Sequence, residues 1–282
     1  IGSSFAAPYV THIAAKIKEK YNNFSSNLIK ALIASSAEKP SQIEDLINDK
    51  LLHFEASKEK IHSNFLSKHK GNTNFDVKKL TYYLVGYGMP KLNNCLDTLE
   101  YRVVLYADTE ITPNLIHIYE IPIPEVFINA KGTKKVTISL AFNPEVRKSR
   151  LDYMGTKMSF RLIRGKSFEE VNEVYSSQKG KNKEDKEELF ESRFICNLGE
   201  PGTTLREKGT LQKGVFKFTK PQNYGEFYYL VVNCEKKWSE KIQNYAVVII
   251  LETEDKKARL FNIIKNKIRQ REKVKPRIKT QI

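Results

Sequence analysis

The sequence predicts a chain in two parts, a mostly helical N-terminal part followed by an all-β antiparallel sandwich of jelly-roll-like architecture. Up to about residue 105, apolar residues recur at the three- and four-residue spacing of helices. Beyond that point, short segments rich in β-branched and aromatic residues alternate with turn signals. The 282 residues suffice for two domains of ordinary size, which we place at residues 1–105 and 106–282.

Two helices are predicted near the start of the chain. The first covers residues 4–20, and the second runs from Ser25 or Ser26, both good N-cap residues, to about Ala34. The apolar stripe expected on the first helix consists of Ala6, Ala7, Val10, Ala14 and Ile17.

The stretch between residues 40 and 99 contains a third helix, a polar insertion and a tight turn. Residues 41–44 form a capping box that opens the third helix. Residues 53–80 are polar, and their three histidines are too widely spaced to suggest a metal site. The run Gly86 to Pro90, with two glycines and a proline, predicts a tight turn into a short helix over residues 91–99.

The pattern beyond residue 105 predicts mainly β-strands. The segment 119–124 carries two prolines, so it is expected at an edge or crossover and not in the centre of a sheet. A short helix is expected over residues 169–175 and a charged loop over 176–188. A docked helix in the basic tail is indicated by Leu260, Ile263, Ile264 and Ile268. The expected strands are Arg102–Ala107, His117–Ile121, Lys135–Phe142, Lys157–Arg164, Gly214–Phe218, Phe227–Asn233 and Tyr245–Glu252.

The beginning of the first helix has the composition of a nucleophile segment. Gly2 permits a sharp turn and close approach of a substrate. Ser4 would lie beside the unpaired N–H groups of the first helical turn, which stabilise an anion. Ala6 and Ala7 would keep that turn thin enough to pack against neighbouring elements, and Pro8 would cost little because it lies near the helix start.

Residues 2–8 resemble the serine motif of the subtilisin-like serine peptidases, Gly-(Thr/Ser)-Ser-(Met/Phe)-Ala-(Ala/Ser)-Pro, at all seven positions. The run from Gly86 to Pro90 resembles the Gly-x-Gly segment that precedes the last helix of those domains. The resemblance implies that residues 1–105 are the C-terminal, mostly helical part of a three-layer α/β peptidase domain. It also implies that Ser4 is the catalytic nucleophile and that its backbone N–H contributes to the oxyanion hole. The motif residues that support it are Gly2, Ser3, Ala6, Ala7 and Pro8.

In the resembled family the catalytic Asp and His and the oxyanion Asn all precede the serine. We therefore expect this chain to be the C-terminal part of a longer serine endopeptidase that cleaves polypeptides through an acyl-enzyme on Ser4. Alone, the chain is expected to be inactive. None of its own histidines has a supporting motif, and His12 stands where the family has a packing glycine. The alternative is a pseudopeptidase whose sandwich and basic tail recognise a protein or nucleic-acid partner.

Charge and cysteine content bound the remaining function classes. The formal net charge of +15 permits nucleic-acid binding. A solvated helix face explains most of the basic tail, however, so nucleic acid is not the expected partner. The three cysteines have no metal-ligand or disulfide spacing, which favours buried thiols, a cytoplasmic location, no metal and no cofactor. No apolar run is long enough to span a membrane.

Overall fold

The computed structural model describes residues 3–43, 45–46, 81–96, 98–176, 199–270 and 279–281. The chain forms two compact units. One contains residues 1–35 together with 92–282, and the other contains residues 36–91. The described part combines helices with antiparallel sheets, so the expected mixture of helical and β structure is confirmed.

The expected N-terminal helices are present. Helix α1 spans Ser3–Lys20 and helix α2 spans Ser26–Ser36. Ser25 caps α2 because its hydroxyl accepts a hydrogen bond from the backbone N–H of Leu28, at 3.1 Å. A short helix, α6, covers Leu92–Leu96 within the longer range predicted after the glycine turn.

The buried face of α1 contains Ile17 of the predicted stripe but otherwise differs from it. Ile13 and Ile17 are fully buried, whereas Ala6, Ala7 and Val10 are exposed. Neither isoleucine is left in water. They pack instead on the outer face of a β-sheet in the same chain.

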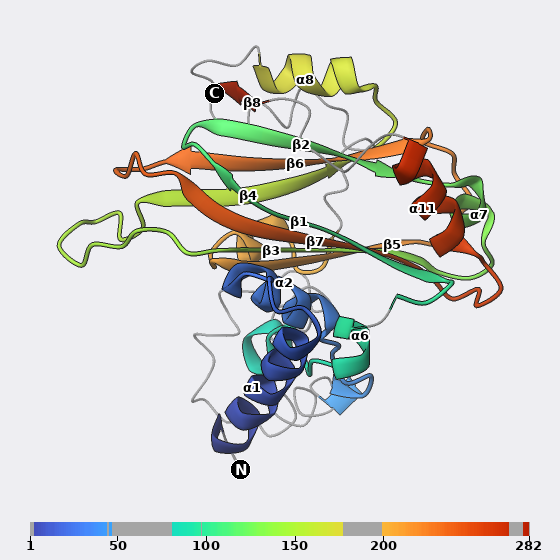
Figure 1. Cartoon of the computed structure of the whole chain (residues 1–282), viewed down its shortest axis with the longest axis horizontal. Coiled ribbons are helices and arrows are strands. Elements are labelled where there is room, and N and C mark those ends of the chain that lie inside the picture. The colour runs from blue at the N-terminus through green and yellow to red at the C-terminus, as the bar shows by residue number, and fades with distance from the viewer. Residues whose placement is uncertain are drawn as a thin grey trace, which may run out of the picture. The chain divides into compact units, whose positions relative to one another are not determined.

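All seven expected strands are present, together with a short eighth strand that the sequence did not reveal. They form two antiparallel sheets, with orders β1-β7-β3-β5 and β4-β6-β2-β8, so consecutive strands alternate between the sheets (Figure 1). The strands are β1 Arg102–Ile111, β2 Leu115–Pro122, β3 Lys134–Phe142, β4 Thr156–Ile163, β5 Leu211–Phe218, β6 Phe227–Lys236, β7 Gln243–Thr253 and β8 Lys279–Gln281.

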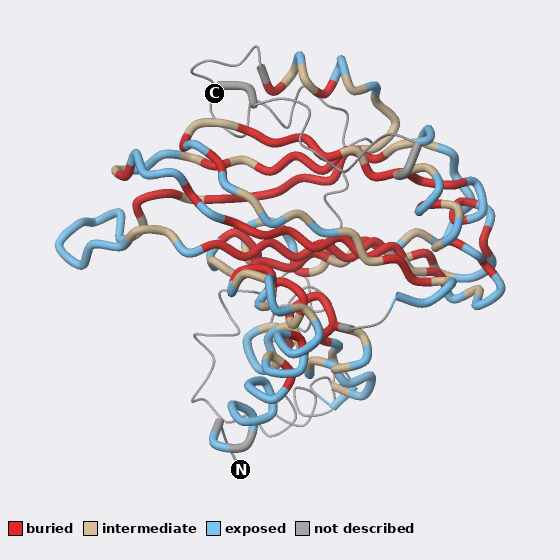
Figure 2. The backbone as a smooth tube through the Cα atoms, in the orientation of Figure 1, coloured by how far each residue is buried: buried red, intermediate tan, exposed pale blue. Residues whose placement is uncertain are grey.

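Both sheets contribute to one apolar core, and helices cover both outer faces. The inner cluster combines residues of β1, β3, β5 and β7 with residues of β2, β4 and β6, drawn as the buried segments of Figure 2. Helices α1 and α2 cover the outer face of the first sheet, and α8 covers that of the second. The tail helix α11 docks through Leu260 and Ile264, as expected. The remaining described helices are α7 Glu125–Asn129, α8 Phe168–Ser176, α10 Thr203–Arg206 and α11 Leu260–Gln270.

The proline-containing segment behaves as an edge over most of its length. β2 pairs with β6 throughout, but β8 pairs only with residues 115–117, so residues 118–122 have a single described neighbour. Pro122 ends the strand and Pro124 precedes α7. The domain boundary near residue 105 and the jelly-roll-like topology class stay predictions.

The unit of residues 36–91 contains the glycine turn. Gly86 and Gly88 both have positive φ, +57° and +92°. A Cβ on Gly88 would lie 2.1 Å from the carbonyl oxygen of Glu38, so only glycine fits there. Glu38 and Met89 form a β-bridge beside it. The predicted turn is therefore confirmed. Most of the third helix and the histidine-containing stretch 53–80 lie outside the described residues, as does the loop beyond residue 176.

A polar cluster lies inside the core between the sheets. The hydroxyl of Tyr245 on β7 is 2.6 Å from Nδ1 of His117 and 2.5 Å from the hydroxyl of Tyr119, both on β2. All three side chains are fully buried. Burial raises the pKa of Tyr119 to about 12, although its hydrogen bond with Tyr245 lowers it in part. Burial also raises the pKa of Tyr245, and the neighbouring Tyr119 adds to that increase.

The docking of α1 predicts a large effect of Ile17→Ala. Truncating this fully buried side chain should lower the free energy of unfolding by about 2–5 kcal/mol. Val10→Ala, on the exposed part of the same helix, should change it by less than about 0.5 kcal/mol. Urea unfolding followed by circular dichroism measures both. Equal, small effects would contradict the docked position of α1.

The tyrosine cluster predicts loss of stability at alkaline pH. An unfolded tyrosine loses its proton near pH 10, whereas Tyr119 in the folded chain keeps its proton up to about pH 12. The buried neutral tyrosines therefore contribute their full stabilisation to the folded chain below about pH 10. This stabilisation is lost between about pH 10 and 12, with a slope of about 1.4 kcal/mol per pH unit for each buried tyrosine. Urea unfolding between pH 8 and 11.5 measures this slope.

The Tyr119→Phe variant should show a shallower slope over the same pH range. Tyr106→Phe is the matched control because Tyr106 is half-exposed on β1. If Tyr119→Phe kept the slope of the parent chain, the buried phenol would not be its source.

Candidate functional site

Ser4 lies in the first turn of α1, and its side chain is exposed. Ser3 is the first residue of that helix, and Gly2 lies outside the described residues. Ala6 and Ala7 follow on exposed positions, so no described element packs against the first turns. The serine therefore stands at an accessible helix end, which is the location predicted for it.

The electrostatics of this helix end favour a negative charge. The first four N–H groups of an α-helix have no partner within the helix, and the helix dipole places partial positive charge there. The backbone N–H of Ser4 is one of these groups. The first turn of α1 carries no acidic residue that would compete for them. An oxyanion forming next to Ser4 would therefore be stabilised.

Pro8 lies inside α1 and not at its start. In a regular helix the N–H of residue 8 would donate to the carbonyl oxygen of Ser4, and proline cannot supply that donor. The expectation that Pro8 would cost little because it lies near the helix start was therefore wrong. Because Pro8 has no N–H, the carbonyl oxygen of Ser4 lacks its helical hydrogen bond.

None of the described histidines can act as the base for Ser4. His12 is exposed on α1 but eight residues further along, which is about 12 Å of helix rise. A general base must approach to about 3 Å. His117 is bonded to Tyr245 in the core between the sheets. Within the described part of the chain the Ser4 side chain makes no hydrogen bond, so its role as a nucleophile stays a prediction.

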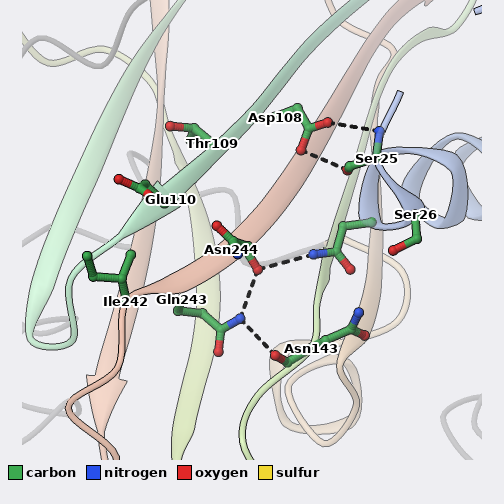
Figure 3. Close-up of a pocket in the computed structure, with 10 residues that line it drawn as sticks. Ser25, Ser26, Asp108, Thr109, Glu110, Asn143, Ile242, Gln243 and Asn244 are labelled. Atoms are coloured by element: carbon green, nitrogen blue, oxygen red, sulfur yellow. Dashed lines mark hydrogen bonds between the residues drawn. The ribbon is translucent and has the colours of Figure 1, made fainter. Parts of the chain in front are cut away.

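Helix α2, which follows the serine-motif helix, contacts the first sheet at a polar hollow of about 710 Å³ (Figure 3). Both oxygens of Asp108 on β1 accept hydrogen bonds from Ser25, one from its hydroxyl at 2.8 Å and one from its backbone N–H at 3.2 Å. The side-chain amide of Asn27 donates to the carbonyl oxygen of Asn244 at 3.2 Å. The same sheet edge thus holds both the cap and the first turn of α2.

The amide of Gln243 extends this set of hydrogen bonds between α2 and the first sheet, which we call the joint. It donates to the carbonyl oxygens of Asn143, at 3.1 Å, and Asn244, at 2.8 Å (Figure 3). The carboxylate of Asp108 and the side-chain N–H of Asn27 are occupied by contacts between α2 and the strands. The hollow therefore positions α2. Its Ser25–Asp108 pair serves as the cap of that helix, because the hydroxyl of Ser25 also accepts a hydrogen bond from the N–H of Leu28.

Other kinds of site are not found in the described part of the chain. Its His, Cys, Asp and Glu side chains form no group of three or more that could hold a metal ion. No described helix has both the length and the apolar character needed to cross a bilayer. Cys95 and Cys234 are buried thiols, as expected, and Cys196 lies outside the described residues.

Sequence reasoning missed the joint because its members are distant in sequence. Asp108 and Ser25 are separated by 83 residues, and Asn27 and Asn244 by 217. Ser25 was recognised as an N-cap, but no local pattern identifies the carboxylate that holds it.

Comparison with known proteins points to the same region as the serine motif. Residues 1–74 match the model of the subtilase family. The chain is also 31% identical over 270 residues to an uncharacterized protein, y4bN, of Sinorhizobium fredii (strain NBRC 101917 / NGR234). That alignment covers 95% of this chain and 56% of the relative, so the chain spans little more than half of the relative's length.

The joint predicts that Asp108→Ala destabilises the chain. It removes a charged acceptor from the cap of α2, so we expect a loss of about 1–2 kcal/mol in the free energy of unfolding. Glu110→Ala removes a neighbouring exposed carboxylate and should change it by less than about 0.5 kcal/mol. Urea unfolding distinguishes the two. If both variants matched the parent chain, Asp108 would not hold the helix.

Proposed function

We propose that this chain is the C-terminal part of a subtilisin-like serine endopeptidase in which Ser4 is the nucleophile. The observation that carries the proposal is the seven-residue match of residues 2–8, with Ser4 exposed in the first turn of a helix. The match of residues 1–74 to the subtilase family model supports it. The longer relative is consistent with a polypeptide that continues beyond this chain.

In the proposed reaction, Oγ of Ser4 attacks the carbonyl carbon of the scissile peptide bond while a histidine takes its proton. The oxyanion is stabilised by the N–H of Ser4 together with an asparagine. The leaving amine takes the proton from the histidine, and water then hydrolyses the acyl-enzyme. The histidine, its aspartate and the asparagine come from an upstream segment of the full-length protein, so this chain alone is inactive.

The exposed half of α1 supports a further packing partner in that full-length protein. Tyr9 and Val10 are more than one-third exposed, and Ala6 and Ala7 beside them present little side-chain bulk. Small residues allow close approach of another element. We propose that upstream strands of the peptidase domain pack here, while Ile13 and Ile17 on the other half already face the first sheet.

The remaining parts of the proposal concern the second domain and its setting. The two sheets from about residue 106 form a jelly-roll-like sandwich attached to the peptidase domain, which occupies residues 1–105. The substrate is a polypeptide. Buried thiols at Cys95 and Cys234 support a cytoplasmic location.

Ser4→Ala tests the proposal in the full-length protein. A fluorescent fluorophosphonate should label the parent protein at Ser4, and Ser4→Ala should abolish labelling. The variant should also cleave denatured casein slower by roughly 10⁶-fold, the loss typical when the nucleophile of a triad is removed.

Ser26→Ala is the matched control, because Ser26 is an exposed serine at the start of the neighbouring helix. It should keep both labelling and casein cleavage. A folded full-length protein in which Ser4 is not labelled would overturn the proposal and favour a pseudopeptidase.

A further inference from the structure

The loop between β3 and β4, residues 143–155, is an ordered projection beyond the end of the sheets (Figure 1). Two backbone hydrogen bonds close it, from the N–H of Arg147 to Tyr153 at 3.0 Å and from that of Gly155 to Glu145 at 2.7 Å. The two sides of the loop are therefore bonded to each other, and these bonds restrict the conformation of its tip.

The turn between β6 and β7 braces this loop from the side. The carbonyl oxygen of Gly155 accepts backbone hydrogen bonds from Lys237, Trp238 and Ser239, at 3.0–3.1 Å. The indole N–H of Trp238 donates to the carbonyl oxygen of Asp152 at 2.7 Å. A Cβ on Gly155 would lie 2.5 Å from that of Ser239, so the close contact requires glycine.

The braced loop presents apolar side chains to solvent. Leu151 at its tip is fully exposed, and Tyr153 is half-exposed. An exposed leucine on a mobile loop would be unremarkable. On a loop fixed by its own backbone and by Trp238, it offers apolar area that can be buried without a large cost in ordering the chain.

These side chains form one wall of a hollow of about 860 Å³, which we call the basic hollow. Leu151, Tyr153 and Met154 supply apolar lining. Lys157 on β4 and Lys208 after α10 supply positive charge to the same lining. A hollow of this volume suits a small ligand or a few side chains of a peptide.

The charges of the basic hollow do not cancel. Glu207 is held in a buried ion pair by Arg161. Glu235 lies opposite Lys157 across the β4–β6 pair, but it bonds Lys237 at 2.5 Å. That hydrogen bond, and to a smaller extent the charge of Asp152, raises the pKa of Lys237.

Glu207 and Glu235 are therefore each matched by a basic group, whereas the carboxylate of Asp152 acts on Lys237 only as a nearby charge. Lys157 and Lys208 form no ion pair with any described residue. Together with Glu235, the lining carries four basic and three acidic side chains, so a net charge of +1 remains beside the apolar wall.

We propose that the basic hollow docks an acidic polypeptide segment that carries a large apolar side chain. Carboxylates of the segment pair with Lys157 and Lys208, and the apolar side chain packs against Leu151 and Tyr153. A nucleic-acid duplex is too wide for a hollow of this size. This docking requires no catalysis and is independent of the proposed peptidase function.

Fluorescence anisotropy of the full chain with a labelled peptide tests the proposal. The probe is fluorescein-Gly-Glu-Asp-Leu-Phe-Asp-Glu-Gly. The Lys157→Glu, Lys208→Glu double variant should bind it at least about tenfold more weakly, because two attractions become repulsions. Lys220→Glu, Lys256→Glu is the matched control, with the same change in net charge at exposed lysines outside the hollow. It should keep the affinity of the parent chain.

A second variant separates the apolar contact from charge. Leu151→Ser should weaken peptide binding severalfold without changing the unfolding midpoint, because Leu151 is fully exposed. The matched probe in which serine replaces Leu and Phe should bind the parent chain as weakly as the full probe binds this variant.

Three results would overturn the proposal. One is equal affinity of the two double-lysine variants for the peptide. Another is no saturable binding of the peptide at millimolar concentration. The third is binding of single-stranded DNA or phosphatidylserine vesicles that depends on Lys157 and Lys208 while the peptide fails to compete, which would assign the hollow to that other partner.

Discussion

Strand β7 is apolar on both faces, and the rest of the fold depends on covering both of them. Tyr245, Val247, Ile249 and Leu251 face the core shared by the two sheets, while Ala246, Val248 and Ile250 belong to the cluster with α1 and α2. A strand at the surface of a two-layer structure would leave the second set in water, at roughly 1.5–3 kcal/mol for each large side chain. Helices α1 and α2 therefore stabilise the first sheet, and the sheet in turn fixes the position of both helices.

The identity of the elements was predictable because it is encoded locally. The alternation of apolar residues from Lys135 to Phe142 identified β3 to within one residue, and the spacing of Leu260 and Ile264 identified the docked tail helix. The pairing partners were not predictable, since β1 joins β7 across more than 130 residues. The strand β8 escaped notice because three residues carry too little pattern.

The buried face of α1 shows where periodicity alone fails. Ala6, Ala7, Val10, Ala14 and Ile17 make a regular stripe, yet the structure buries Ile13 and Ile17. Size decided the outcome, since two isoleucines remove more apolar area from water than alanines do. For the candidate site, the motif placed Ser4 correctly at a helix end. The hollows formed by Asp108 and by Lys157 with Lys208 depend on residues brought together by the strands, and no contiguous pattern contains them.

The distance in sequence between α1 and β7 has a consequence for biosynthesis. A ribosome adds roughly 5–20 residues per second, so about 10–50 s separate the synthesis of Ile17 from that of Val248. During that interval the serine helix exists without the surface that buries it. The alternation of strands between the sheets prevents either sheet from closing before β6 and β7 emerge. Completion of the fold therefore waits for the synthesis of β7, and the nascent helix must remain soluble until then.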